Sequence, residues 1–147
     1  SYNEYWQVLN EGLKPEELTV FRYEDEGVAT LEDGLYVVGD NLKDAAFKDK
    51  MVRFVRASMK GWKYAETNQA EAAEIVVNND DSGAQTIDHN TTQMGEIAKL
   101  TAGSNGSLSE ADFNRTVSSL MTGGSDPVIT KKPVGAWSHA ITDAALN

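Results

Sequence analysis

The most regular hydrophobic pattern in the chain lies between Asn41 and Asn68. Its apolar side chains recur at steps of three, four and one residues, which places them on one face of an α-helix of about seven turns. Lysine and arginine side chains occupy the opposite face, so we expect that face to be solvated and the helix to serve as scaffold. The apolar stripe consists of Phe47, Met51, Phe54, Val55, Met59, Trp62 and Ala65.

Shorter helices are predicted on both sides of this stretch. Asn68 and Glu71 have the spacing of a capping-box variant at the start of one of them, and Ser109 is a suitable N-cap for another. Glycines follow several of these patterns, as expected where helices end. The predicted ranges are about 2–10, 68–77, 86–101, 109–122 and 141–146.

Three stretches have the composition of β-strands. Leu18–Tyr23 is rich in β-branched and aromatic residues, and Val28–Val38 contains the uninterrupted apolar run Leu35–Val38. Such a run is typical of a strand that is buried on both faces. A third short strand is predicted at residues 128–130. The fold expected for this chain is therefore predominantly helical with two or three short strands.

Composition narrows the function classes. The chain has 147 residues, 40% of them hydrophobic and 24% charged, which is typical of one folded domain. Its net charge of -10 argues against nucleic acid as a partner, because phosphate binding needs clustered positive charge. It has no cysteine, so disulfides and thiolate chemistry are excluded. Because it begins at Ser1 without a leader pattern, we expect a processed protein or an excised part of a longer one.

Motifs for catalysis are absent from the sequence. No nucleophile elbow, phosphate loop or dinucleotide fingerprint occurs, and the two histidines, His89 and His139, have no acidic residues at metal-ligand spacing. Residues 78–83 resemble the start of a calcium loop, but His89 stands where that loop needs a glutamate. We therefore expect a plain turn there, and neither a metal nor a cofactor.

The amino end carries the most distinctive chemistry. Tyr2, Asn3, Glu4, Tyr5 and Trp6 combine flat rings, an amide and a carboxylate within five positions. A small-molecule pocket needs this mixture, because rings supply contact area and polar groups fix orientation. The start of an amphipathic helix with aromatic core residues explains the same pattern, and both interpretations stay open.

Four sequence segments, taken in order, resemble those of a known protein family. They are Asp33–Val38, the helical stretch Lys50–Trp62, Ala65–Val76 and Leu108–Phe113. Their order is similar to that in the C-terminal half of ABC-transporter solute-binding proteins of the nitrate, sulfonate, taurine and thiamine-pyrimidine group. The resemblance covers about Tyr2 to Leu120.

The resemblance implies a parent fold of two α/β lobes, the type 2 periplasmic-binding-protein fold, with ligand held between them. Residues 1–23 would end the second lobe, residues 24–34 would cross between lobes, and residues 35–147 would be the C-terminal helical part of the first lobe. Ligand would then meet the amino end, and a hinge would lie at Glu26 and Gly27. The implied ligand-binding residues are Tyr2, Asn3, Glu4 and Tyr5.

The function implied is that of a substrate-binding component, or a fragment of one, for an ABC-type importer, and not an enzyme. Its partners would be a small polar ligand, the membrane permease and the N-terminal half of the same protein, in the periplasm or anchored outside the cell membrane. The carboxylate of Glu4 favours a ring with N–H donors over an oxyanion, which it would repel. Without the N-terminal half, exposed faces would favour self-association. The alternatives are a pyrimidine-biosynthesis enzyme of the same architecture and a helical protein-interaction module.

Overall fold

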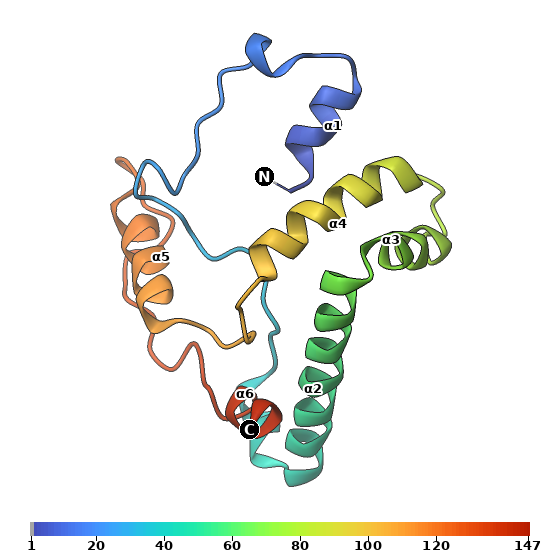
Figure 1. The fold of residues 1–147 in the computed structure, drawn as a ribbon. Coiled ribbons are helices and arrows are strands. Elements are labelled where there is room, and N and C mark those ends of the chain that lie inside the picture. Colours follow the sequence, from blue (N-terminus) through green and yellow to red (C-terminus); the bar gives the residue numbers. More distant parts are fainter. Residues whose placement is uncertain (1) are drawn as a thin grey trace. The chain divides into compact units, whose positions relative to one another are not determined.

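The computed structural model describes residues 2–147, and all regular secondary structure in that range is helical. Figure 1 shows the helices in chain order, coloured from the N-terminus to the C-terminus. The α-helices are α1 (Glu4–Asn10), α2 (Ala45–Thr67), α3 (Gln69–Asn78), α4 (Ile87–Thr101), α5 (Glu110–Thr122) and α6 (Thr142–Leu146), and the 3-10 helices are η1 (Pro15–Glu17) and η2 (Gly39–Lys43).

The chain forms two compact units, each assembled from two separate stretches. The first unit contains Ser1–Thr19 and Arg56–Asn105, and the second contains Val20–Val55 and Gly106–Asn147. Helix α2 therefore gives its N-terminal part to the second unit and its C-terminal part to the first. The predicted lobe segments 1–23, 24–34 and 35–147 follow a different division and stay a prediction.

In the first unit, α4 packs against both α3 and α1 (Figure 1). The contact with α3 is built on Ala72, Ala73 and Met94, which are buried, with Ala65 packed against them. Alanine side chains allow the two helices to approach closely, and the long Met94 side chain fills the space between them. Asn90 is also buried, and its amide donates to Gln85 Oε1 at 2.8 Å and to the Thr86 carbonyl at 3.0 Å.

In the second unit, α5 is the main helical element and holds two extended stretches. The Leu31 amide donates to Thr116 Oγ1 at 2.8 Å, and Arg115 Nε donates to the Ala29 carbonyl at 3.0 Å. The C-terminal stretch contributes Trp137, whose ring centroid lies 6.2 Å from that of Phe113. In this unit Val117 of α5 and Ala145 of α6 are buried.

Side-chain caps begin two of the predicted helices, and one of them, Ser109, is the N-cap that the sequence predicts. Thr86 Oγ1 accepts the His89 amide, and Ser109 Oγ accepts the Asp112 amide, both at 3.3 Å. The capping box predicted from Asn68 does not form. The Asn68 amide donates back to the Tyr64 carbonyl at 2.9 Å, and the Glu71 carboxylate accepts the Tyr64 hydroxyl instead. A capping box would need the Asn68 backbone N–H to donate to the Glu71 carboxylate. Because α2 ends at Thr67, directly before Asn68, this N–H donates instead to the Tyr64 carbonyl of the last turn of α2, at 2.9 Å.

The long central helix is confirmed, but the burial of its stripe is not. Helix α2 begins at Ala45, after Asp44, whose carboxylate accepts the Ala46 amide at 2.9 Å. None of its residues is buried, and Phe54 and Trp62 are 54% and 41% exposed. Helical periodicity fixes which side chains share a face, whereas burial requires another element to cover that face.

The predicted strands are wrong for the described chain, because residues 2–147 contain no strand. Leu18–Tyr23 and residues 128–130 are irregular, and so is Val28–Val38. Within the run Leu35–Val38, exposed fractions range from 38% for Val37 to 81% for Tyr36. A strand needs a neighbouring strand to pair its N–H and C=O groups, and strand-forming composition alone does not supply one.

Candidate functional site

The amino-terminal end of α1 meets the first turn of α4 through a histidine. Asn3 precedes α1, and its carbonyl accepts the backbone amides of Trp6 and Gln7, each at 3.1 Å. Its side-chain Oδ1 lies 2.8 Å from His89 Nε2, and Asn10 Nδ2 at the other end of α1 lies 3.4 Å from His89 Nδ1. One imidazole thus joins both ends of a short helix to α4.

These two contacts define the state of the His89 ring. Asn3 Oδ1 can only accept a hydrogen bond, so His89 Nε2 donates to it. Asn10 Nδ2 can only donate, so His89 Nδ1 accepts from it. The tautomer with its hydrogen on Nε2 satisfies both contacts, so each ring nitrogen has an asparagine partner.

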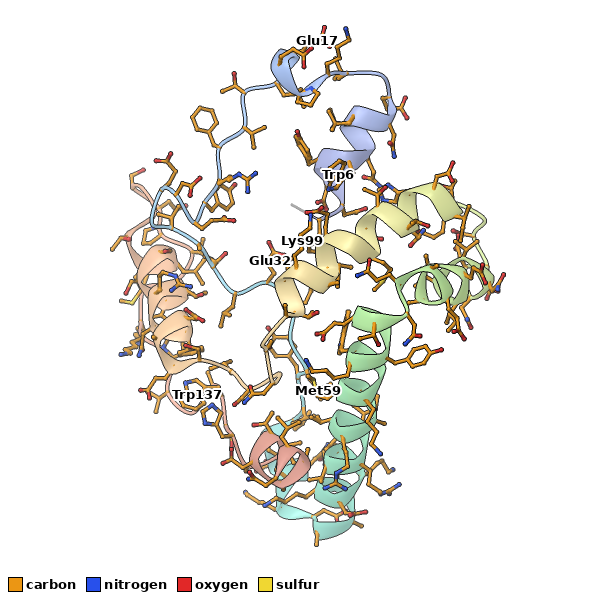
Figure 2. All side chains as sticks on the ribbon, in the orientation of Figure 1. Trp6, Glu17, Glu32, Met59, Lys99 and Trp137 are labelled. Atoms are coloured by element: carbon orange, nitrogen blue, oxygen red, sulfur yellow. The ribbon has the colours of Figure 1, made fainter. Side chains whose placement is uncertain are left out.

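Aromatic rings gather on α1 beside this contact. The Tyr5 and Trp6 rings meet edge to face, with centroids 5.4 Å apart and an interplanar angle of 79°. Trp6, labelled in Figure 2, has a buried indole Nε1 that finds no hydrogen-bond partner among the described residues. An unpaired buried donor is costly, so this N–H is a place where a bound acceptor would stabilise the protein.

The predicted ligand-binding residues lie at the amino-terminal end of α1, and their exposure differs. Tyr2, Asn3 and Tyr5 are partly buried, whereas Glu4 is exposed. Asn3 is joined to a distant part of the chain through His89, and Tyr5 is packed against Trp6. The pocket interpretation and the amphipathic-helix interpretation are thus compatible, because α1 packs against α4 and also carries polar groups at its amino-terminal end. Their role in ligand binding stays a prediction.

The predicted hinge residues form a tight turn. The Gly27 amide donates to the Glu24 carbonyl at 3.3 Å, and the Val28 amide donates to the Tyr23 carbonyl at 3.0 Å. Gly27 has φ +74°, in the region where residues with a side chain are strained. Glu26 and Gly27 are both exposed. A turn of this kind can reverse the chain, and its action as a hinge stays a prediction.

A shallow, open depression of about 510 Å³ lies on the first unit where the end of α2 and the start of α3 meet α4. Glu66 forms an ion pair with Lys63, with an N–O distance of 3.0 Å. The Glu66 side chain is 17% exposed, and that of Lys63 is 57% exposed. The Lys63 ammonium, followed by the Thr101 hydroxyl, lowers the pKa of Glu66. The lining residues are Glu66, Gln69, Gly95, Ala98, Lys99 and Ala102.

The loop between α3 and α4 is organised by one carboxylate. Asp80 accepts the Ser82 amide at 2.9 Å, the Ser82 hydroxyl at 2.5 Å and the Gln85 amide at 2.7 Å. These donors lower the pKa of Asp80, the Ser82 hydroxyl having the largest effect and the Gln85 amide the next. The structure therefore has the turn predicted for residues 78–83, and the Asp80 carboxylate is the acceptor that stabilises it. Within residues 2–147, no three His, Cys, Asp or Glu side chains are grouped to hold a metal ion.

Sequence analysis missed the partners that the fold brings to these sites. His89 and Asn3 are 86 residues apart, so no local pattern connects them. The available signals were indirect: Thr86 as a cap places His89 in the first turn of its helix, and the spacing of Gly95, Ala98 and Ala102 puts small residues on one face.

The first part of the chain belongs to a class of solute-binding proteins of ABC transporters. The match that establishes this is to the family model described as NMT1/THI5 like, and it covers residues 1–72. Residues 1–72 are therefore an NMT1/THI5-like segment, from the sulfonate, nitrate and thiamine-pyrimidine group. The matched range contains α1, α2 and the start of α3, and residues 73–147 lie outside it.

This family consists mainly of binding proteins without catalytic activity, although THI5 members synthesise pyrimidine. It has the type 2 periplasmic-binding-protein fold and is typically periplasmic. No curated protein and no solved structure matches the chain. In residues 2–147, every helix is too short or too polar to cross a membrane.

Proposed function

We propose that this chain is part of the substrate-binding component of an ABC-type importer, and that its amino end contacts the ligand. The observation that carries the proposal is the family match over residues 1–72, which include α1 and its cluster of rings and polar groups. Such a protein binds a small molecule and presents it to a membrane permease, which would be its second partner.

The chemistry of the amino end favours a ring with N–H donors as the ligand. Glu4 is an exposed acceptor beside the edge-to-face pair of Tyr5 and Trp6. Aromatic faces supply contact area for a flat ring, and a carboxylate accepts its N–H groups. Sulfonate and nitrate would be repelled by the same carboxylate, so a pyrimidine-like ligand is favoured among the three ligand types of the family.

An enzymatic role is the less favoured alternative. It would need a reactive histidine or a metal site, and the chain has only two histidines, His89 and His139. Both ring nitrogens of His89 are used by α1, and His139 Nε2 donates to the Leu108 carbonyl at 2.7 Å. Because the family of the matched segment consists mainly of binding proteins, we favour binding over acid–base catalysis at the amino end.

The extended stretch 20–38 supports a further partner, the N-terminal half of the same protein. Nine large hydrophobic side chains in this stretch are exposed, and they lie on an irregular backbone. In the α/β parent fold such a stretch would pair as a strand and bury these side chains. The nine residues are Val20, Phe21, Tyr23, Val28, Leu31, Leu35, Tyr36, Val37 and Val38.

A ligand screen on the intact protein tests the proposal. Thermal stability would be measured with pyrimidines, sulfonates and nitrate, because a ligand that binds only the folded state raises the melting temperature. We expect a pyrimidine-type ligand to raise it and nitrate to leave it unchanged. The absence of a shift with all three ligand types would contradict the proposal.

Variants of α1 then locate the site. Glu4→Gln should weaken binding of the identified ligand about tenfold, the loss expected when one charge-assisted hydrogen bond becomes neutral. Glu11→Gln, at an exposed position directly after the same helix, is the matched control and should bind normally. Equal affinity of the two variants for the ligand would remove Glu4 from the site.

A further inference from the structure

The connection between α4 and α5 contains the only asparagine of the sequence that is followed by glycine, at Asn105 and Gly106. This Asn-Gly pair lies outside the helices, because α4 ends at Thr101 and α5 begins at Glu110. Both residues of the pair are exposed, so water and hydroxide reach them. The proposed function gives this connection no role.

The chain is held before and after the Asn-Gly pair. Before it, the Ser104 amide donates to the Thr101 carbonyl at 2.9 Å. After it, the Leu108 carbonyl accepts a hydrogen bond of 2.7 Å from His139 Nε2. Gly106 itself has φ +76°, in the left-handed region that glycine adopts without strain. The pair thus occupies a short irregular segment between two fixed points of the chain.

An asparagine side chain can react with the backbone nitrogen of the next residue. That nitrogen, after losing its proton to hydroxide, attacks the side-chain carbon Cγ, which is held close to it by the chain. The N–Cγ bond forms, the Cγ–Nδ2 bond breaks, and ammonia leaves, so that a five-membered cyclic imide results. Water then opens the imide at one of its two carbonyl carbons. The products are aspartate and isoaspartate, and one water has been consumed for each ammonia released.

Two features of the Asn-Gly pair favour this reaction. The attacking nitrogen belongs to Gly106, which has no Cβ to crowd the ring as it closes. Because the pair lies outside α4 and α5, the backbone can rotate into the cyclising conformation without opening a helical turn. A residue with a side chain at position 106, or a helical backbone, would oppose ring closure.

Other candidate positions lack one of these features. Asn90 is buried in α4, and its amide donates to the Thr86 carbonyl at 3.0 Å. Asn114 is inside α5 and is followed by Arg115, whose side chain hinders ring closure. Asp33 is exposed and is followed by glycine, but it has no amide nitrogen to release as ammonia. Exposure, an irregular backbone and the Asn-Gly sequence therefore coincide at Asn105.

We propose that Asn105 is a self-modification site of the folded chain, where the cyclic imide forms with Gly106 and converts the asparagine to isoaspartate and aspartate. No enzyme and no co-reactant other than water is needed. The reaction adds one negative charge to a chain whose net charge is -10. In the isoaspartate product the main chain also passes through Cβ of residue 105, which lengthens the connection between α4 and α5 by one methylene group.

The test incubates the native 147-residue chain at mildly alkaline pH and follows each asparagine by peptide mapping and mass spectrometry. We expect conversion at Asn105 to be at least about tenfold faster than at any other asparagine, a barrier lower by about 1.4 kcal/mol. Hydroxylamine cleaves the cyclic imide, so it should release fragments 1–105 and 106–147 from the native chain. A native chain in which Asn105 stays unmodified, while the chain unfolded in guanidinium chloride reacts, would overturn the proposal.

Three variants separate ring closure at this pair from a general effect of the loop. Gly106→Ala places a Cβ on the attacking residue and should slow conversion of Asn105 at least about tenfold. Gly103→Ala is the matched control, because Gly103 also has a left-handed φ, +78°, but its nitrogen takes no part, so Asn105 should react at the native rate. Asn105→Gln, at an exposed position, would need a larger ring and should give no hydroxylamine fragments. Native rates in a folded Gly106→Ala protein, equal slowing by Gly103→Ala, or cleavage of Asn105→Gln at this position would contradict the site.

Discussion

Asn3 Oδ1 accepts a hydrogen bond of 2.8 Å from His89 Nε2. This bond connects a residue of the NMT1/THI5-like segment to a helix outside the matched range, and both lie in the first unit. It also accounts for the orientation of α1, a helix of seven residues that is too short to be stable by itself. The amino-terminal cluster of rings therefore depends on a contact that the rest of the first unit supplies.

Replacing His89 by alanine should loosen α1. The variant loses its bonds to Asn3 and Asn10, and each hydrogen bond of this kind is worth about 1 kcal/mol. We expect a lower free energy of unfolding by urea and faster hydrogen exchange of the α1 amides. Gln7→Ala, at an exposed position of the same helix, is the control and should change neither. Unchanged α1 exchange in the His89 variant would show that the contact does not hold the helix.

Asp80→Ala should destabilise the protein in a pH-dependent manner. The Ser82 hydroxyl, followed by the Gln85 amide, lowers the pKa of Asp80 below 3.8 in the folded state. A lowered pKa means that the ionised carboxylate stabilises the fold above about pH 4, and that this stabilisation is lost as the pH falls through the folded-state pKa. Urea unfolding of the variant and the native chain should therefore differ at pH 7, and the difference should shrink as the pH falls through the lowered pKa of Asp80.

The control for this prediction is Asp81→Ala, at the neighbouring exposed position. It changes the net charge by the same amount but leaves the Asp80 bonds to Ser82 and Gln85 in place. Equal pH profiles for the two variants would mean that general charge, and not the turn bonded to Asp80, governs the effect.

The Tyr64 hydroxyl should titrate at a lower pH when its partner is removed. It donates to Glu71 Oε2 at 2.5 Å, and this bond raises the pKa of Tyr64 above 10.0. The bond stabilises the fold while Tyr64 is protonated and is lost as the pH rises through the raised pKa. Glu71→Ala should return the pKa toward 10.0, followed by the ring carbon signals of Tyr64 in NMR spectra and assigned with Tyr64→Phe. The same titration midpoint in Glu71→Ala and the native chain would contradict the bond.

The exposed stretch 20–38 should drive self-association when its partner is absent. Val38 is 68% exposed in this stretch, and Tyr36 is 81% exposed. Changing both to serine should shift sedimentation toward the monomer at tens of micromolar, because apolar contact area is lost. Val134→Ser removes an apolar side chain that is 97% exposed outside the stretch, and it should have little effect. A native chain that sediments as a clean monomer at these concentrations would refute self-association.

The sequence was a good guide to the helices, because their signals are local. The periodic stripe from Phe47 to Trp62 marked α2, the cap Ser109 marked the start of α5, and the predicted range 86–101 agrees with α4 within one residue. The strand prediction for Leu35–Val38 failed for a different reason. Its apolar, β-branched and aromatic residues are typical of a buried strand, but residues 2–147 contain no strand with which it could pair.

By itself, the sequence determined the helical segments, the family of the first 72 residues and the mixture of rings, amide and carboxylate at the amino end, because these depend on residue types and short spacings. The tertiary structure alone decided that His89 joins the ends of α1 and that Glu66 and Gln69 face the small residues of α4. These relationships depend on packing between helices distant in the chain, and no short-range pattern encodes such a meeting.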